Sequence, residues 1–482
     1  MTRSLKYGAA TGGILLAGVL AFVLASGSTT PEAPRAAEPP AAAPPPAPPE
    51  RRPAEFARAR CPRVYARYAL PGLRCLQLTV PADHWAQERG QVRLMVVRMG
   101  HPSGPRDPLL IVPGGPGGTL EPYLQLFATS RSLRERLLGT REVLVLDARG
   151  SGGSRPALHC RTPRRAADAV QANVACAEQL ERRVDDLSLF DSRQSAVDIG
   201  AIARATNLEG IDVYAASWGT RVVLEAMAID GEALKDVVLD GVVPADENLF
   251  TSRASNLEES LEAIEAGCRR QARCRRMAPD LGKDLDRLGR RYGDVLAPGL
   301  TDLLASRYSL PTVPGLVHRA AEGKVGPLAR RLAQAFRGRS QVSDGAYLSG
   351  ICRDRSAATP PRKVALSADS VSPLAAAAAR SAAEDRDACV VWPVDPDTRR
   401  SAATEGLDHR ALLLAGLYDP ITPPSDARHA MLAFENAQLV ILRHASHTVL
   451  DTSCGLKLIT AFLDDRLDPR QTKCARRELT LR

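Results

Sequence analysis

The chain has 482 residues, enough for a large hydrophobic core and for two or three domains at about 150 residues each. Its formal charge of +9 comes largely from arginines, which are scattered in pairs and form no long basic run with interleaved aromatic residues. This pattern argues against nucleic acid as a partner and favours solvated helix faces.

Residues 1–28 are typical of an export signal. Arg3 and Lys6 give a positive start, an apolar run covers residues 8–25, and small residues follow. A run of about 18 residues is at the short end for a membrane span, so a cleaved signal peptide is the first hypothesis and an uncleaved anchor the second. We expect a secreted or periplasmic protein, bound to a membrane only if this segment is retained.

Residues 29–55 are dominated by proline and alanine and predict an extended linker. The ten cysteines all follow it, and an even count in an exported chain suggests disulfides. Chain order offers five local pairings, although order alone does not prove connectivity: 61–75, 160–176, 268–274, 352–389 and 454–474. No Cys or His spacing is typical of zinc, so no metal is expected.

Residues 56–243 alternate strand and helix patterns. Short apolar runs, typical of buried parallel strands, or alternating runs predict strands at 74–81, 92–99, 108–112, 142–146, 211–216 and 237–239. A helix is predicted at 192–206, with its apolar residues on one face. Alternating strands and helices indicate an α/β fold with a mostly parallel sheet that helices cover on both faces.

The pattern changes in residues 244–405, which are helical, rich in alanine and arginine, and long enough for an inserted cap. The strand rhythm resumes in residues 406–482, with strands predicted at 411–416 and 438–442 and a helix at 455–463. The sheet is therefore expected to be built from two parts of the chain, on either side of the cap.

Ser217 follows the apolar run 211–216 at once and precedes a helical pattern. A strand, a tight turn with serine at its apex, and a helix form a nucleophile elbow. Such a turn needs small residues two positions before and after the serine, and Ala215 and Gly219 stand there; glycine is more usual at both, so Ala215 departs from the motif. The N–H of Trp218 is then the first expected oxyanion donor.

A serine nucleophile needs a histidine base and a carboxylate that orients it. Asp419 follows one late strand and His447 the next, in the order serine, acid, histidine of α/β-hydrolases. Two rivals remain: Asp240 for the acid, and His444 for the base. We favour His447 because His444 lies closer to its strand, although Asp419 before a proline could also simply start a turn.

The run from Pro113 to Gly118 supplies a glycine-rich loop after an apolar strand. Glycine lets a backbone approach a substrate closely, so Gly114 and Gly115 both fit this role, and the N–H of Gly115 is the second expected oxyanion donor. The loop lacks the features of a phosphate-binding loop. An ion pair of Asp147 with Arg149 is a hypothesis for what braces it, and an ordinary strand-end turn is the alternative.

These motifs together resemble the secreted bacterial tripeptidyl aminopeptidases, relatives of prolyl iminopeptidase within the α/β-hydrolase fold. The resemblance covers about residues 61–474 and depends on the order of the segments 113–118, 147–154, 240–242 and 419–423, with Ser217 and His447. It implies an α/β-hydrolase with a helical cap that removes short peptides or single residues from free N-termini. It also implies the 352–389 disulfide, and it makes Asp354 the candidate that binds the substrate's α-ammonium group.

The sequence thus predicts an exported serine peptidase that uses Ser217, Asp419 and His447 on peptide substrates, without a metal or organic cofactor. Two alternatives stay open. A carboxylesterase could use the same triad on a small ester, and a catalytically inactive hydrolase fold could serve as a binding protein. An acidic site near Ser217 would favour the peptidase, and a purely apolar tunnel the esterase.

Overall fold

The computed structural model describes residues 54–101, 104, 106–160, 169–338, 342–369, 371–399, 401 and 403–482. The predicted export signal and nearly all of the predicted linker lie outside these residues and stay predictions. The described residues belong to one compact unit, Pro44–Arg482. Among them, no helix is both long and apolar enough to cross a membrane.

A nine-stranded sheet forms the centre of this unit, in the order β1-β2-β3-β5-β4-β6-β7-β8-β9. β1 to β3 and the β3–β5 pair are antiparallel, and the other neighbours are parallel. The mostly parallel sheet predicted from the sequence is confirmed, and only β1 has no predicted counterpart. The strands are β1 (Phe56–Ala59), β2 (Arg74–Pro81), β3 (Gln91–Gly100), β4 (Leu109–Val112), β5 (Glu142–Asp147), β6 (Ile211–Ala216), β7 (Leu234–Asp240), β8 (Ala411–Gly416) and β9 (Ala437–Leu442).

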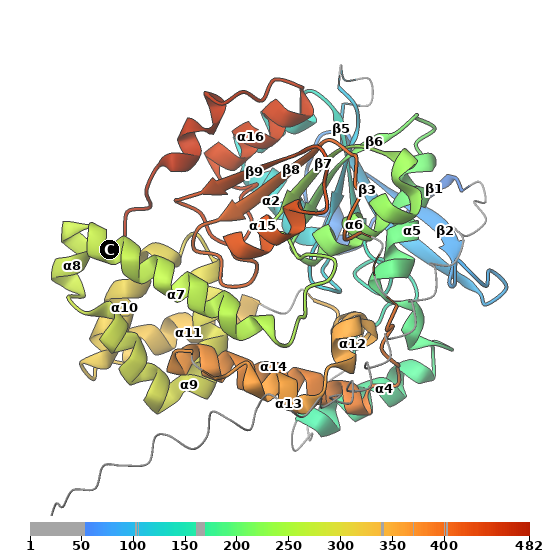
Figure 1. Cartoon of the computed structure of the whole chain (residues 1–482). Coiled ribbons are helices and arrows are strands. Elements are labelled where there is room, and N and C mark those ends of the chain that lie inside the picture. The colour runs from blue at the N-terminus through green and yellow to red at the C-terminus, as the bar shows by residue number, and fades with distance from the viewer. Residues whose placement is uncertain are drawn as a thin grey trace, which may run out of the picture. The chain divides into compact units, whose positions relative to one another are not determined.

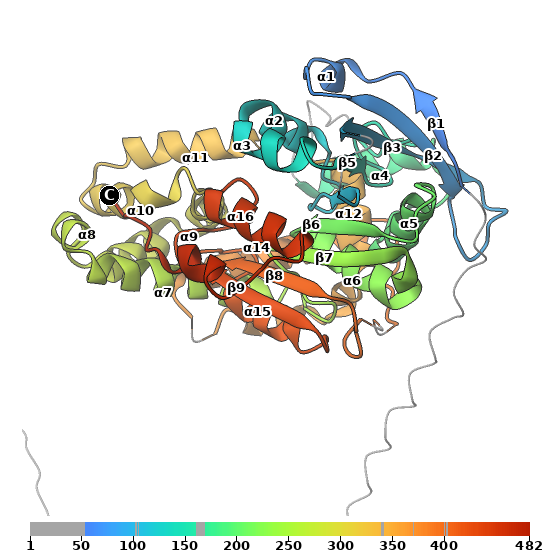
Figure 2. The ribbon, with the colours of Figure 1, turned by 90° about the horizontal axis from the view of Figure 1, so that it is seen from above.

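Helices cover both faces of the sheet, because alternate strand residues point to opposite sides and nearly all are apolar. One face packs against α5 (Ser192–Arg204), α6 (Trp218–Asp230) and α15 (Pro424–Met431). The other packs against α2 (Glu121–Thr129), α3 (Arg131–Leu133), η1 (Arg134–Leu138) and α16 (Ser453–Leu463). Figure 2 shows α5 and α6 on one side of the strands and α2 and α16 on the other. The structure has the α/β-hydrolase fold, as predicted.

A helical insertion, residues 241–410, separates β7 from β8 (Figure 1). Its longer helices bury leucines against one another in a separate core, to which Tyr418 after β8 and Leu481 near the C-terminus also belong. β7 and β8 nevertheless pair directly, so the chain leaves the sheet and returns at neighbouring strands. The α-helices are α7 (Ser252–Arg270), α8 (Ala272–Met277), α9 (Leu281–Ala305), α10 (Val313–Ala321), α11 (Gly326–Gly338), α12 (Asp344–Arg353), α13 (Pro361–Leu366) and α14 (Pro373–Val391).

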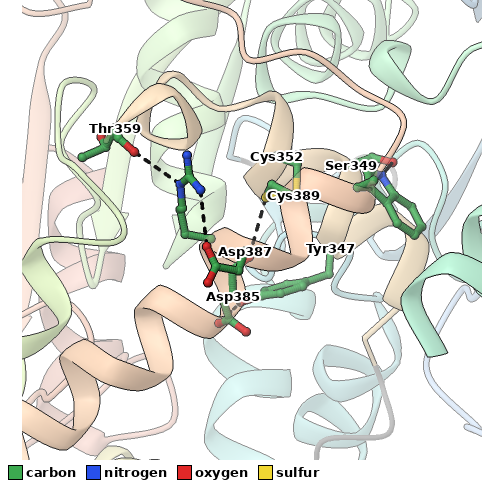
Figure 3. Close-up of a disulfide and its surroundings, with 9 residues drawn as sticks. Tyr347, Ser349, Cys352, Thr359, Asp385, Asp387 and Cys389 are labelled. Carbon is green, nitrogen blue, oxygen red and sulfur yellow. Dashed lines mark hydrogen bonds and ion pairs between the residues drawn. A yellow bond between two sulfur atoms is a disulfide. The ribbon is translucent and has the colours of Figure 1, made fainter. Parts of the chain in front are cut away.

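All ten cysteines form disulfides, in the five local pairs that chain order offers: 61–75, 160–176, 268–274, 352–389 and 454–474. The Cys352–Cys389 bond joins α12 to α14, and in Figure 3 the side chain of Tyr347 points from α12 toward Asp385 of α14 beside it. Five disulfides fit an extracellular or periplasmic protein, since such bonds persist in oxidising compartments.

Candidate active site

Ser217 lies on the turn between β6 and α6 with a strained backbone. Its φ is 53° and its ψ −127°, a region that costs a non-glycine residue about 1–3 kcal/mol. The turn leaves no room for a side chain at Gly219, where a Cβ would lie 2.6 Å from the carbonyl oxygens of Val112 and Pro113. Ala215 is accommodated, fully buried in the sheet core. A strained serine at the carboxyl end of a central strand is the geometry of a nucleophile elbow.

The glycine-rich loop after β4 passes directly beside Ser217. A Cβ at Gly114 would lie 2.7 Å from the Cβ of Ser217 and 3.3 Å from its Oγ, so only glycine fits there. Gly114, one residue before Gly115, is thus the glycine that contacts the serine. Within the described part of the chain, the N–H groups of Gly115 and Trp218 donate no hydrogen bond.

Asp419 and His447 form a buried, hydrogen-bonded pair. The Nδ1 of His447 lies 2.8 Å from Oδ2 of Asp419, which also accepts from the hydroxyl of Thr422 at 2.8 Å. The other carboxylate oxygen accepts from the N–H groups of Ile421 and Thr422, at 2.8 and 3.0 Å. Four donors therefore fix a fully buried carboxylate. With Nδ1 engaged, Nε2 is the ring nitrogen that can take a proton from a substrate or a serine.

The surroundings of His447 favour its charged form. Burial alone lowers the pKa of an imidazole, but the charge of Asp419, the hydrogen bond to it and the charge of Asp240 outweigh burial and raise the pKa of His447 above its ordinary value. No hydrogen bond joins the Ser217 hydroxyl to His447 among the described residues. Such bonds are often long before a substrate binds.

The two rivals from the sequence are placed differently. The carboxylate of Asp240 accepts from Tyr214 and from the backbone after His447, and it makes no hydrogen bond to the imidazole. His444 has a buried Nδ1 without a described partner, and burial lowers its pKa. Among the sequence candidates, Asp419 and His447 are the aspartate and histidine that the structure brings into hydrogen-bonding contact.

Asp354 lies in the insertion, apart from this pair. Its buried carboxylate forms an ion pair with Arg221 at 2.9 Å and accepts from the N–H and hydroxyl of Ser356, at 2.9 and 2.6 Å. Both residues line a cavity of about 460 Å³ between α6 and the insertion. Arg221 also lies over the Trp218 ring, 5.5 Å from its centroid, and so links the cavity to the elbow.

The predicted ion pair between Asp147 and Arg149 is wrong. Arg149 pairs with Asp198 at 2.7 Å. Asp147 instead accepts from the N–H of Leu120 at 2.7 Å and from the hydroxyl of Tyr65 at 2.6 Å, so it braces the end of the glycine-rich loop through backbone contact.

Sequence reasoning missed two neighbours of the site. Thr422 supports both Asp419 and His447, and Arg221 joins the elbow to the insertion. Only Thr422 left a local signal, since a hydroxyl three residues after an aspartate is typical of a closed turn. Among the described residues, no cluster of His, Cys, Asp and Glu has the arrangement of a metal site.

Comparisons with known proteins address the family and the class of enzyme. Residues 373–474 match the family described as TAP-like protein. Over this segment the chain resembles the TAP-like α/β-hydrolases. It is 23% identical to Carboxylesterase B of Mycobacterium tuberculosis over 455 residues, which cover 83% of this chain and 86% of that protein. It is also 23% identical to Serine protease Hip1 of the same organism over 465 residues, which cover 84% and 87%.

Among solved structures, the chain is similar to an α/β-hydrolase fold protein from Chitinophaga pinensis. The identity is 14%, the TM-score is 0.39, and the match covers 82% of this chain and 98% of the other. The sequence relatives support a serine hydrolase and carry one esterase name and one protease name at the same identity.

Proposed function

We propose that the chain is an exported serine peptidase that cleaves peptide bonds near free N-termini, as an aminopeptidase or a tripeptidyl aminopeptidase. The observation that carries the proposal is the buried Asp419–His447 pair at 2.8 Å together with a strained Ser217 on a nucleophile elbow. A strained serine and an oriented imidazole, both at the carboxyl edge of one sheet, are what acyl transfer to a serine requires.

The reaction proceeds in two halves. The Oγ of Ser217 attacks the carbonyl carbon while Nε2 of His447 takes its proton, and the imidazolium then gives that proton to the leaving amine. The N–H groups of Trp218 and Gly115 stabilise the oxyanion, and Asp419 holds the imidazolium. In the second half, water attacks the acyl-enzyme by the same route and the product leaves with a free carboxylate.

The cavity beside the elbow supports a peptide rather than a small ester. Arg221, which lines the cavity, stands one helical turn after Ser217, about 6 Å along the helix axis. At 460 Å³ it has the size of an ordinary ligand site. Charged side chains of both signs line it, among them the carboxylates Asp191, Glu225, Asp246, Glu247, Asp354 and Asp397. A substrate with a charged end suits such walls better than an apolar ester does.

Asp354 remains the proposed ligand for the α-ammonium group. Arg221 neutralises it in the protein without substrate, so an incoming ammonium would share the carboxylate with this guanidinium. Ser356 holds the same carboxylate and fixes its orientation.

Covalent labelling by a fluorophosphonate tests the nucleophile. The wild type should be labelled and Ser217→Ala should not. The control Ser195→Ala should be labelled at the wild-type rate, because Ser195 lies at the start of α5, where its hydroxyl donates to the carbonyl of Asp191. Labelling of Ser217→Ala at the wild-type rate would show that the reactive serine lies elsewhere.

A substrate series separates the peptidase from the esterase. Aminoacyl and tripeptidyl amides are compared free and N-acetylated, beside a short ester, with wild type and Asp354→Asn. We expect acetylation to abolish turnover of the amides and Asp354→Asn to raise KM for the free amides. Amide turnover that is indifferent to acetylation, or turnover of the ester alone, would favour the carboxylesterase that one relative's name suggests.

A further inference from the structure

Asp240, the last residue of β7, touches both loops of the proposed site. Its backbone carbonyl accepts from the N–H of Ser217 at 2.9 Å. Its carboxylate Oδ2 accepts from the N–H groups of Val449 and Leu450, at 2.7 and 3.2 Å, directly after the turn that carries His447. One residue at the carboxyl end of β7 therefore accepts hydrogen bonds from the backbone of Ser217 and from the backbone just after His447.

The turn that Asp240 holds is itself strained. Thr448, between His447 and Val449, has a φ of 61°, which is rare for a β-branched residue. Hydrogen bonds from two consecutive N–H groups to one carboxylate are charge-assisted and stronger than neutral ones. They stabilise the turn in this conformation, and the imidazole of His447 depends on it for its place.

The carboxylate is buried without full compensation. Asp240 is fully buried, the hydroxyl of Tyr214 donates to its Oδ2 at 2.6 Å, and its Oδ1 has no partner among the described residues. An unpaired oxygen in a protein interior is costly, and burial raises the pKa of this carboxyl to about 6. The next residue, Gly241, packs against the imidazole, since a Cβ at this position would lie 3.3 Å from Cε1 of His447.

Few charged groups face this part of the molecule. His447 is faced by Asp419 from the loop after β8 and by Asp240 from β7. Asp240 is faced by Tyr214 of β6 and acts on Tyr123 of α2. Asp451, after the His447 turn, acts on Tyr214 and is itself paired with Arg307. Asp240 is thus the second carboxylate whose charge acts on the imidazole.

We infer that Asp240 is a positioning residue for the proposed reaction: it fixes the Ser217 and His447 loops relative to each other and adds a second negative charge that stabilises the imidazolium. This role rests on the proposed serine hydrolase reaction. It differs from that of Asp419, because Asp240 acts on the ring through backbone and charge rather than through a hydrogen bond to it.

The test substitutes Asp240→Asn, which keeps the shape and one acceptor oxygen but removes the charge. Fluorophosphonate labelling rates are measured from pH 5 to 9, with kcat and KM on an amide. We expect labelling and kcat to fall about tenfold, the size of effect that a small misplacement of reacting groups gives. KM should stay close to the wild-type value. Without the second anion, His447 binds its proton less tightly, so the acid limb of the rate profile should move to lower pH.

The matched control is Asp236→Asn, on the same strand at its other end, where the carboxylate pairs with Arg410. It should keep the wild-type rate and profile. If Asp240→Asn does not fold, Tyr214→Phe keeps the carboxylate and removes one of its three donors, and it should shift rate and profile in the same direction by less. Wild-type protein that is not labelled would refute the proposed function. Labelled wild type, with Asp240→Asn at the same rate and the same acid limb, would refute the role of Asp240 alone.

Discussion

Gly114 and Gly219 show how little space surrounds Ser217. Each would place a Cβ within 2.7 Å of a neighbouring atom, the first at the serine side chain and the second at carbonyls of the loop after β4. Contacts this short cannot be absorbed without moving the backbone. Because the atoms that must move belong to the nucleophile or to the loop beside it, the cost falls on the reaction as well as on stability.

Gly114→Ala should therefore remain folded and lose activity. We expect a fall in kcat of about 100-fold, since a displacement near 1 Å at reacting groups has that effect. Gly326→Ala is the control, because a Cβ there meets only the end of the Arg330 side chain at 3.5 Å. Circular dichroism and amide hydrolysis check both variants, and a fully active Gly114→Ala would mean that this loop lies farther from the reacting atoms.

The pair Asp419–His447 sets the pH dependence. His447 acts as a base only when neutral, and its pKa is raised, so activity should increase with pH through a value above that of an ordinary histidine. Asp419→Asn removes the largest charge that opposes burial, and should shift this limb to lower pH while kcat falls about 10⁴-fold. The pH–rate profiles of the wild type and of Asp419→Asn measure the position of this limb and the fall in rate. A limb that does not shift would mean that a group other than His447 titrates there.

At the residue scale, the sequence predicted the positions of site residues that directly follow strands. It did not predict which side chains from distant parts of the chain form ion pairs. Ser217, Asp419 and His447 each come directly after an apolar run, so their shared edge follows from strand order. The partner of Arg149 is Asp198, 49 residues away on α5, and the partner of Asp354 is Arg221. No period or local motif relates such pairs, because helix packing alone brings them together.

Among the elements, α12 connects the insertion to the proposed oxyanion loop. The N–H of Ser343, its N-cap, donates to the carbonyl of Gly117 at 2.9 Å, and Gly350 packs against Pro116. The other end of α12 is held to α14 by the Cys352–Cys389 disulfide (Figure 3). The helix thus transmits the position of the insertion to the glycine-rich loop.

Replacing Cys352 and Cys389 by serine should lower the free energy of unfolding by about 2–4 kcal/mol and also raise KM, because α12 loses its fixed end. Replacing Cys454 and Cys474 removes a disulfide between α16 and η7 (Gln471–Arg476), far along the chain from α12, and should lower stability without raising KM. Thermal unfolding and steady-state kinetics compare the two double variants. Equal KM values would show that the position of α12 does not affect substrate binding.

The elements were largely predictable. Strand β2, for example, runs from Arg74 to Pro81 as its alternation predicts, and β6 from Ile211 to Ala216. β1 was not predicted, because its four residues are half exposed and form a strand only by pairing with β2. The arrangement of the insertion helices was also beyond the sequence, since their apolar faces fit one another in several ways and only packing decides.

For the whole molecule, several buried carboxyls have a raised pKa, and in four of them it reaches about 6 or more. Burial is the main cause in each: it raises the pKa of Asp147, Asp212 and Asp240 to about 6 and, with nearby carboxylates, that of Asp426 to about 8. In the unfolded chain an aspartyl pKa is about 3.9. At pH values between the unfolded and the folded pKa, the folded protein binds more protons than the unfolded chain does. The contribution of these carboxyls to the free energy of unfolding is therefore lost as pH rises.

The midpoint of thermal unfolding should accordingly be higher at pH 6 than at pH 8. His447 adds to this trend, and His444, whose pKa is lowered, opposes it. Asp426→Asn should remove most of the difference between the two pH values, whereas Asp280→Asn, at a fully exposed carboxyl, should leave it. A midpoint that rises from pH 6 to pH 8 would contradict the raised values.

The direct pairing of β7 with β8 has a consequence for how such proteins diverge. Adjacent strands lie about 4.8 Å apart, and because these two are parallel the insertion leaves at the carboxyl end of β7 and returns at the amino end of its neighbour β8. Its length and sequence can change without altering the register of either strand, and the edge that carries Ser217, Asp419 and His447 is left in place. Relatives can thus keep the sheet while the insertion varies, and α12 is the part of the insertion whose contacts with the glycine-rich loop must be kept.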